Sequence, residues 1–294
     1  MNNDRIQEIL DLMEEARLDY FLISDPQSIA YCTGYYNDPH ERMFVFMISK
    51  HGNHTLFMND LFYLEHDLDV NIVWHKDGQD AIQTIVDEMH FPGRIGIDKN
   101  WASHFLLDLM KKLPDAKYIN ASPCVDLVRM KKDLQEQVLM IESSKINDAV
   151  MEEIIPFIQE GVTEKQLAKK LDELFFNHHS TCYGAIVAFG KNAADPHHEN
   201  DDTPLRKGDC VLIDMGCVYK GYCSDMTRTF FYEGILEEEI KVYEIVKKAN
   251  EAAEAMIKPG VKLSDIDKCA RKVISDEGYG KYFTHRLGHF IGRD

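Results

Sequence analysis

Apolar residues over the first 122 positions follow helical and strand-like spacings in turn. Ile6, Ile9, Leu10 and Met13 fall on one helical face and predict an opening amphipathic helix. Short apolar runs predict strands at 20–23, 43–48, 55–58, 71–74 and 94–97, and helical patterns cover 81–89 and 105–113. This alternation predicts a small α/β domain over residues 1–122.

A second domain is expected over residues 123–294, after a linker at Asn120-Ala121-Ser122-Pro123. Long helices are predicted through about residue 176, with a break near Gly161. A strand at 185–189 and a polar loop through Asp209 come next. Further strand-like runs follow that loop, and the last predicted helices cover 236–257 and 264–276. This half therefore mixes helices with a small number of strands.

Two consecutive strand-like runs in the second domain each carry an aspartate. Asp214 ends the apolar run 211–213, and Asp225 precedes the run 226–232. A tight turn at 219–220 would place the aspartates directly opposite each other, and a turn at 220–221 would make them diagonal neighbours. In both registers they point to the same face, because strand side chains alternate with period two.

Two carboxylates on one face repel each other, and a buried carboxylate is costly unless it is paired or bound to a metal. Asp214 follows three apolar residues, which favours a sheltered position. A cation between the aspartates would remove the repulsion, and His289 would add a nitrogen ligand. Such donors suit manganese, cobalt, iron or zinc. The alternative is a pair of solvated aspartates on an exposed hairpin.

Composition and charge exclude several classes of function. The 294 residues carry a net charge of −17 without a basic stripe, which argues against nucleic acid binding. The seven cysteines suggest no disulfide framework, which suits a reducing cytoplasm. We find neither a signal-peptide pattern nor an apolar run of membrane length. We therefore expect a cytoplasmic protein that does not associate with membranes.

Three ordered motifs resemble the dinuclear metallopeptidases of the pita-bread fold, which include methionine aminopeptidase, aminopeptidase P and prolidase. Residues 214–216 and 221–229 are close to the signature of prolidase and aminopeptidase P. Residues 288–292 resemble the histidine-ligand motif, with Phe290 where many members have glycine and aminopeptidase P enzymes have a bulky residue. Residues 192–197 resemble the loop with a substrate-binding histidine, and residues 31–35 and 41–42 resemble the N-terminal domain of prolidases and creatinases.

The resemblance implies a role for each of these site residues. Asp214 would bind one metal ion, Asp225 would bridge two, and His289 would bind the other. His197 and His285 would be catalytic, contacting the scissile peptide and steadying the tetrahedral intermediate. The implied cofactor is a pair of divalent ions, with manganese favoured over cobalt, zinc and iron, and the implied assembly is a homodimer.

Both histidines assigned to the substrate have plainer alternatives. His285 and His289 have the i, i+4 spacing of a helical zinc pair, although Gly288 and Gly292 argue against a helix there. His197 could be a solvated loop histidine beside His198. The family motif favours His289 as ligand and His285 as its neighbour.

An internal repeat accompanies this pattern. Residues 158–163 resemble residues 257–262, and the offset from Gly161 to Gly260 is 99 residues. Counterparts of the two aspartates would then fall near 313 and 324, beyond residue 294. The resemblance also implies two glutamate ligands further on. We therefore expect a pita-bread domain with its pseudo-two-fold repeat, with its last strands missing and its metal sites incomplete or empty.

The leading functional hypothesis is a proline dipeptidase, which hydrolyses the Xaa-Pro bond of dipeptides or short peptides. The first alternative is an aminopeptidase P, which releases a residue before proline. The second is a non-catalytic or inactive member of the fold, which an incomplete site favours and the retained site residues disfavour. A creatinase-like hydrolase without metal is disfavoured because it leaves the acidic pair unneutralised.

Overall fold

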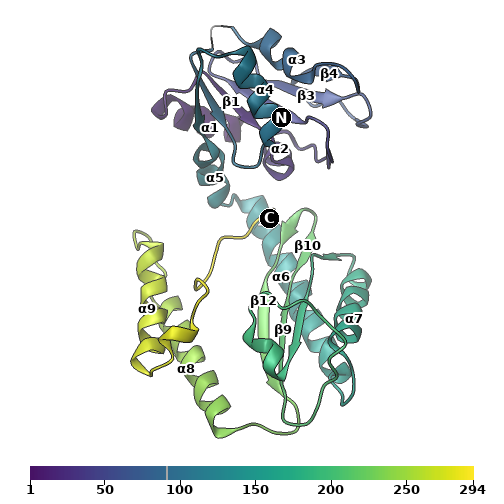
Figure 1. Cartoon of the computed structure of the whole chain (residues 1–294), viewed down its shortest axis with the longest axis vertical. Helices are drawn as coiled ribbons and strands as arrows, with labels where there is room; N and C mark the ends of the chain where they lie inside the picture. Colours follow the sequence, from purple (N-terminus) through teal and green to yellow (C-terminus); the bar gives the residue numbers. More distant parts are fainter. Residues whose placement is uncertain (91) are drawn as a thin grey trace. The chain divides into compact units, whose positions relative to one another are not determined.

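The computed structural model describes residues 1–90 and 92–294. The chain forms two compact units, Met1–Lys132 and Asp133–Asp294, coloured purple to blue and teal to yellow in Figure 1. Helix α5 (Ser122–Met130) packs on helix α1 (Asn3–Glu15), so the units divide further along the chain than the linker expected at 120–123.

Within the described residues, a mixed six-stranded sheet in the order β4-β3-β2-β1-β5-β6 forms the centre of the first unit. Strand β2 is antiparallel to both β1 and β3, and the other neighbours pair in parallel. The strands are β1 (Tyr20–Ile23), β2 (Val45–Ser49), β3 (Thr55–Asn59), β4 (Asn71–His75), β5 (Arg94–Ile97) and β6 (Lys117–Asn120). The predicted α/β class and the predicted strands are therefore confirmed, and β6 is an addition.

Helices cover both faces of this sheet, and successive strand residues alternate between them. Phe21 and Ile23 pack with α1, α2 (Pro26–Thr33) and α5. Tyr20 and Leu22 pack with α3 (Ala81–Glu88) and α4 (Ser103–Lys112) on the opposite face. Because both faces are covered, strands β1, β2 and β3 are buried along their whole length and are mostly apolar, without an alternation of buried and exposed residues.

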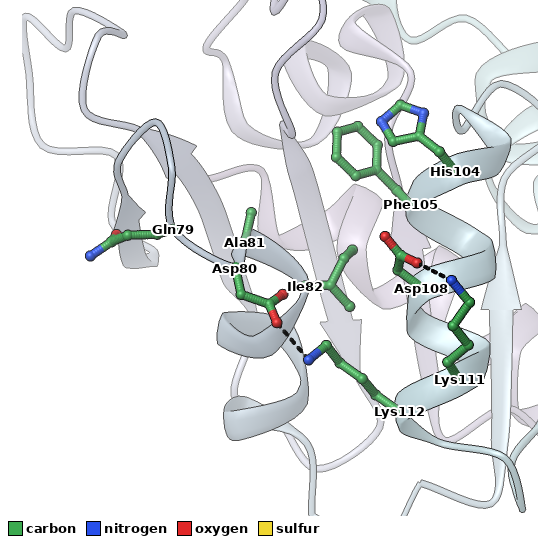
Figure 2. Close-up of a pocket in the computed structure, with 9 residues that line it drawn as sticks. All are labelled: Gln79, Asp80, Ala81, Ile82, His104, Phe105, Asp108, Lys111 and Lys112. Carbon is green, nitrogen blue, oxygen red and sulfur yellow. Dashed lines mark hydrogen bonds and ion pairs between the residues drawn. The ribbon is translucent and has the colours of Figure 1, made fainter.

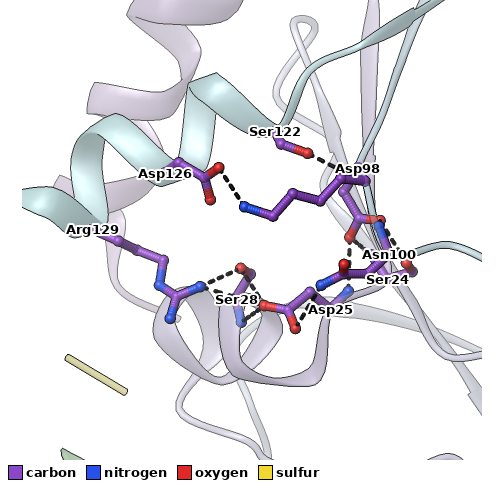
Figure 3. Close-up of polar contacts among 9 residues, drawn as sticks. Ser24, Asp25, Ser28, Asp98, Asn100, Ser122, Asp126 and Arg129 are labelled. Atoms are coloured by element: carbon purple, nitrogen blue, oxygen red, sulfur yellow. Dashed lines mark hydrogen bonds and ion pairs between the residues drawn. The ribbon is translucent and has the colours of Figure 1, made fainter. Parts of the chain in front are cut away.

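A buried polar network ties β1, α2 and α5 together (Figure 3). The carboxylate of Asp98 accepts hydrogen bonds from Ser24 N at 2.5 Å, Ser24 Oγ at 2.7 Å, Asp25 N at 2.7 Å and Asn100 N at 3.0 Å. Asp25 in turn caps α2 by accepting from Ser28 N at 2.8 Å, and Arg129 of α5 donates to Ser28 Oγ at 3.0 Å. Asp98 therefore fixes the start of α2 to the end of β5.

In the second unit, two long helices pack on two small sheets. Helix α6 (Leu134–Ile154), a 3₁₀ turn at Ile155–Phe157 and helix α7 (Glu164–Asn177) come first. The sheets have the orders β12-β9-β8 and β11-β10-β7. Their strands are β7 (Thr181–Cys182), β8 (Ile186–Phe189), β9 (Cys210–Met215), β10 (Cys217–Tyr219), β11 (Tyr222–Cys223) and β12 (Met226–Phe231). A 3₁₀ turn, η2 (Gly190–Ala194), follows β8.

Polar residues of α6 reach the backbone where these two sheets meet. Asn147 Nδ2 donates to the carbonyl of Met215 at 3.2 Å, and Ser143 Oγ donates to the carbonyl of Cys217 at 3.2 Å. The hydroxyl of Tyr222 donates to Glu136 Oε1 at 2.9 Å. These buried contacts fix the chain from β9 to β11 against a rigid helix.

The helix–turn–helix pattern recurs in α8 (Glu237–Glu254) and α9 (Leu263–Asp276), before a 3₁₀ turn, η3 (Gly280–Tyr282). These helices pack together through Ile245, Ala249, Ala270 and Ile274. Gly161 and Gly260 occupy matching turns and both have positive φ, at 83° and 87°. The turn therefore requires glycine in both halves, which supports the predicted repeat.

Replacing Asp98 with alanine is expected to lower the free energy of unfolding of the first unit by about 2–4 kcal/mol, because several donors lose their acceptor. Both tryptophans, Trp74 and Trp101, lie in this unit, so their fluorescence in urea reports its stability. Asp108→Ala, which removes an exposed ion pair with Lys111, is the control and should change stability by less than about 1 kcal/mol. Equal effects would contradict a special role for Asp98.

Candidate metal centre

Residues 210–231 form a hairpin that carries Asp214 and Asp225, which we call the acidic hairpin. It adopts the second of the two predicted registers. Val218 pairs with Cys223 and Tyr219 with Tyr222, so the turn is at Lys220-Gly221. Both turn residues have positive φ, at 49° and 82°, which matches a type I′ turn and its preference for glycine. Further along, Asp214 pairs with Thr227, so Asp225 is the diagonal neighbour of Asp214 rather than its direct partner.

The two carboxylates influence each other, as carboxylates on one face of a hairpin should. Burial raises the pKa of Asp225, the negative charge of Asp214 raises it further, and His289 partly lowers it. The hydroxyl of Thr227 donates to Asp214 Oδ1 at 2.7 Å, which orients that carboxylate. The side chain of Asp225 is nevertheless 37% exposed, so the two carboxylates interact at a face that is open to solvent.

Gly216 and Tyr183 shape the backbone between the aspartates. The hydroxyl of Tyr183 donates to the carbonyl of Ser224, the residue before Asp225. A Cβ on Gly216 would lie 2.1 Å from that carbonyl oxygen and 2.2 Å from the tyrosine hydroxyl, so this position requires glycine. Burial and the charge of Asp225 raise the pKa of Tyr183, which keeps its hydroxyl a donor. Tyr183 was not predicted as a site residue, because an isolated tyrosine belongs to no local sequence pattern.

His289 lies beside Asp225, although 64 residues separate the two in the chain. Its Nε2 is 3.5 Å from Asp225 Oδ2, and its Nδ1 is 2.9 Å from the carbonyl oxygen of Phe290. A carbonyl only accepts, so in the neutral ring Nδ1 carries the proton and Nε2 keeps its lone pair. A lone pair beside a carboxylate oxygen is a suitable arrangement for binding a shared cation.

The segment that carries His289 is attached to the hairpin. Cys223 N donates to the carbonyl of Gly292 at 2.6 Å, and the Arg293 guanidinium lies 5.4 Å from the centre of the Tyr222 ring. Residues 283–294 are not helical. His285 and His289 are therefore not a helical pair, as the glycines in this segment predicted.

The rings of His285 and His197 contact each other within the second unit. Their ring centres are 5.8 Å apart, with the rings nearly perpendicular at 87°. Arg271 of α9 donates to the carbonyls of Phe283 at 2.7 Å and His285 at 3.0 Å, which holds the segment that carries His285. Asp267 accepts from Arg271 Nε at 3.0 Å, and this hydrogen bond lowers the pKa of Asp267.

A second cluster, Glu164, His198 and Asp201, brings potential ligand atoms within 4.8 Å of one another. The oxygens of Glu164 already accept hydrogen bonds from His198 Nε2 at 2.7 Å, Asp201 N at 3.1 Å, Phe189 N at 2.9 Å and Asn192 Nδ2 at 2.9 Å. A buried carboxylate with all these donors is satisfied without a cation. His198, noted in the sequence only as the neighbour of His197, therefore has a partner of its own in Glu164.

Figure 2 shows a hollow of about 520 Å³ in the first unit, between α3 and α4. Its charged lining residues pair with one another, Lys112 with Asp80 at 2.6 Å and Lys111 with Asp108 at 2.7 Å. These four charged side chains are therefore already paired. The acidic hairpin, rather than this hollow, is therefore the candidate site.

Comparisons with known proteins give the family of each unit. Residues 138–294 match Metallopeptidase family M24, and residues 5–131 match the Creatinase/Prolidase N-terminal domain. An uncharacterized peptidase of Staphylococcus aureus (strain bovine RF122 / ET3-1) is 32% identical over 297 residues, which cover 98% of this chain and 83% of the relative.

Solved structures are similar over the same extent. A prolidase from Thermococcus sibiricus has a TM-score of 0.93 and 30% identity, covering 100% of this chain and 83% of that one. An Xaa-Pro dipeptidase from Bacillus anthracis has a TM-score of 0.88 and 27% identity, covering 99% and 82%. Among the described residues, no helix combines the length and apolar character needed to cross a membrane.

Replacing Asp225 with asparagine should stabilise the metal-free second unit at neutral pH by a few tenths of a kcal/mol, up to about 1, because it removes like-charge repulsion. The raised pKa of Asp225 means that its charged form is less favourable in the folded state. The gain should therefore appear as pH rises from about 4 through the raised pKa, and vanish in acid, where the wild-type carboxyl is also neutral.

Calorimetric unfolding between pH 3 and 8, in the presence of a chelator, measures this difference. Asp148→Asn, on the exposed face of α6, is the control and should leave the pH dependence unchanged. Destabilisation by Asp225→Asn at neutral pH would contradict the coupling.

Proposed function

This chain belongs to Metallopeptidase family M24, and from that membership we propose that Asp214, Asp225 and His289 hold divalent metal for hydrolysis of Xaa-Pro dipeptides. The observation that carries the proposal is the position of His289, whose Nε2 lies 3.5 Å from Asp225 Oδ2 while its Nδ1 faces the carbonyl of Phe290 at 2.9 Å, beside a second carboxylate. The family is one of metal-dependent peptidases, and the prolidase and Xaa-Pro dipeptidase structures support the substrate class.

The three residues fit a metal by the chemistry of their donors. They offer carboxylate oxygens and one imidazole nitrogen, a set that suits manganese first and also cobalt, zinc or iron. Binding would relieve the repulsion that raises the pKa of Asp225. When bound, two such ions lower the pKa of a shared water and polarise a carbonyl.

The other residues of the chain position the donors and the substrate. Thr227 and Phe290 orient Asp214 and His289 through hydrogen bonds at 2.7 Å and 2.9 Å. His197 and His285 are proposed to contact the scissile peptide. His285 Nδ1 lies 2.7 Å from the carbonyl of Arg286, so the proton on Nδ1 is engaged and Nε2 is the atom available to a peptide.

Proline after the scissile bond makes a tertiary amide that has no N–H donor. A site for such a bond can exclude ordinary peptides by shape and by the missing donor. Release of a residue before proline from longer peptides, as in aminopeptidase P, is the competing activity.

The protein should bind manganese, because Asp214, Asp225 and His289 offer carboxylate oxygens and an imidazole nitrogen. Thr227→Val keeps the shape of the side chain and removes the donor to Asp214, which should weaken binding about 10–100-fold. Equilibrium dialysis with elemental analysis measures both quantities. Thr229→Val, on the same strand, is the control, and equal manganese affinity in Thr227→Val and wild-type protein would contradict the role of Thr227.

With manganese supplied, the protein should hydrolyse Ala-Pro in preference to Ala-Pro-Ala, and Asp225→Asn should lower kcat/KM by at least about 100-fold, because it removes a proposed ligand. Chromatographic measurement of released alanine checks both statements. Cleavage of the tripeptide alone would favour the aminopeptidase. Hydrolysis that survives Asp225→Asn and chelator would contradict a metal mechanism at this hairpin.

A further inference from the structure

A buried carboxylate organises the loop that carries His197. Glu164 is the first residue of α7, and its side chain is 0% exposed. Its Oε1 accepts from Phe189 N and Asn192 Nδ2, both at 2.9 Å. Its Oε2 accepts from His198 Nε2 at 2.7 Å and from Asp201 N at 3.1 Å. All four of these hydrogen-bond donors therefore come from one stretch of chain, residues 189–201.

These donors lie on both sides of His197. Phe189 ends β8 and Asn192 lies in η2, before the histidine, whereas His198 and Asp201 follow it. Two backbone contacts add to the attachment, from Glu164 N to the carbonyl of Thr203 at 3.2 Å and from Lys165 N to that of Asp201 at 3.1 Å. The loop is thus fixed at both ends to the first turn of one rigid helix.

The position of His197 itself depends on this attachment. Its backbone N–H donates to Asp195 Oδ1 at 3.0 Å, and its ring meets the ring of His285 at 5.8 Å between centres. His198 is the next residue, and its ring is half-buried against Glu164. Because adjacent side chains share a backbone, holding the ring of His198 limits the directions in which His197 can point.

We propose that Glu164 and His198 are positioning residues that hold His197 against His285. The relevance of this placement to hydrolysis rests on the proposed function, but the placement itself does not. Neither residue touches the acidic hairpin ligands, so losing them should leave metal binding unchanged and displace His197.

The test uses the full chain with ¹³C-labelled histidine, free of metal. Wild-type protein should show a nuclear Overhauser effect between the rings of His197 and His285, as their 5.8 Å separation allows. His198→Gln should reduce this effect at least about threefold, and Glu164→Gln should do so more strongly. The control is His178→Gln, because His178 Nε2 pairs with Glu153 at 3.0 Å in the same unit and does not contact the loop.

Kinetics gives a second readout. His198→Gln should lower kcat for Ala-Pro on the order of 10- to 100-fold, because displacement by about 1 Å can cost 100-fold, while manganese affinity stays unchanged. If Glu164→Gln fails to fold, His198→Gln still decides the matter, since Glu164 keeps its backbone donors in that variant.

An unchanged ring contact in His198→Gln would overturn the proposal, as would the lack of that contact in wild-type protein. Broadening of the His198 signals by manganese before those of His289 would also overturn it, because Glu164 and His198 would then be metal ligands. A contact that is lost as expected, in a protein that hydrolyses neither peptide, would support the positioning role and count against the proposed function alone.

Discussion

The repulsion between Asp214 and Asp225 is the constraint on which the second unit depends. The hairpin places both carboxylates on one face, and burial together with the negative charge of Asp214 raises the pKa of Asp225. The residues next to the two aspartates hold the carboxylates on the same face of the hairpin. Gly216 admits the hydroxyl of Tyr183, which fixes the backbone before Asp225, and Thr227 fixes the carboxylate of Asp214. Such a pair is stable when a cation neutralises it, as in a metallopeptidase.

The histidines are positioned by a different principle. Each lies in irregular chain, where the backbone alone does not define a side chain's direction. Each such segment is held by charged side chains on a helix, Glu164 of α7 for the loop of His197 and the Asp267–Arg271 pair of α9 for the segment of His285. Asp214 thus lies on β9 and Asp225 directly before β12, whereas the irregular segments carry His197, His285 and His289.

The sequence predicts the features that depend on residues close together in the chain, and it does not predict those that depend on residues far apart. Strands such as 94–97 and the acidic pair were predicted because apolar periodicity is local. The choice between the two hairpin registers required the positive φ of Lys220, which no local pattern specifies. Strand β6, Tyr183 and the Glu164–His198 contact were missed because they depend on partners distant in sequence. Helix α2 had a readable signal in Asp25-Pro26 and Gly34, the usual start and end of a helix.

The repeat suggests why helices after a glycine turn hold both histidine segments. Gly161 and Gly260 each form the turn that comes before a helix, α7 in the first half and α9 in the second. Each helix therefore begins at the same distance after its glycine turn, to within one residue. In α7 the anchoring carboxylate is in the first turn, where the positive end of the helix dipole favours it. In α9 the carboxylate lies one turn further along and is paired with Arg271, which supplies the positive charge that the helix end supplies to Glu164. In both halves a carboxylate on the helix therefore holds an irregular segment through hydrogen bonds, Glu164 through His198 and Asp267 through Leu287 N and Arg271.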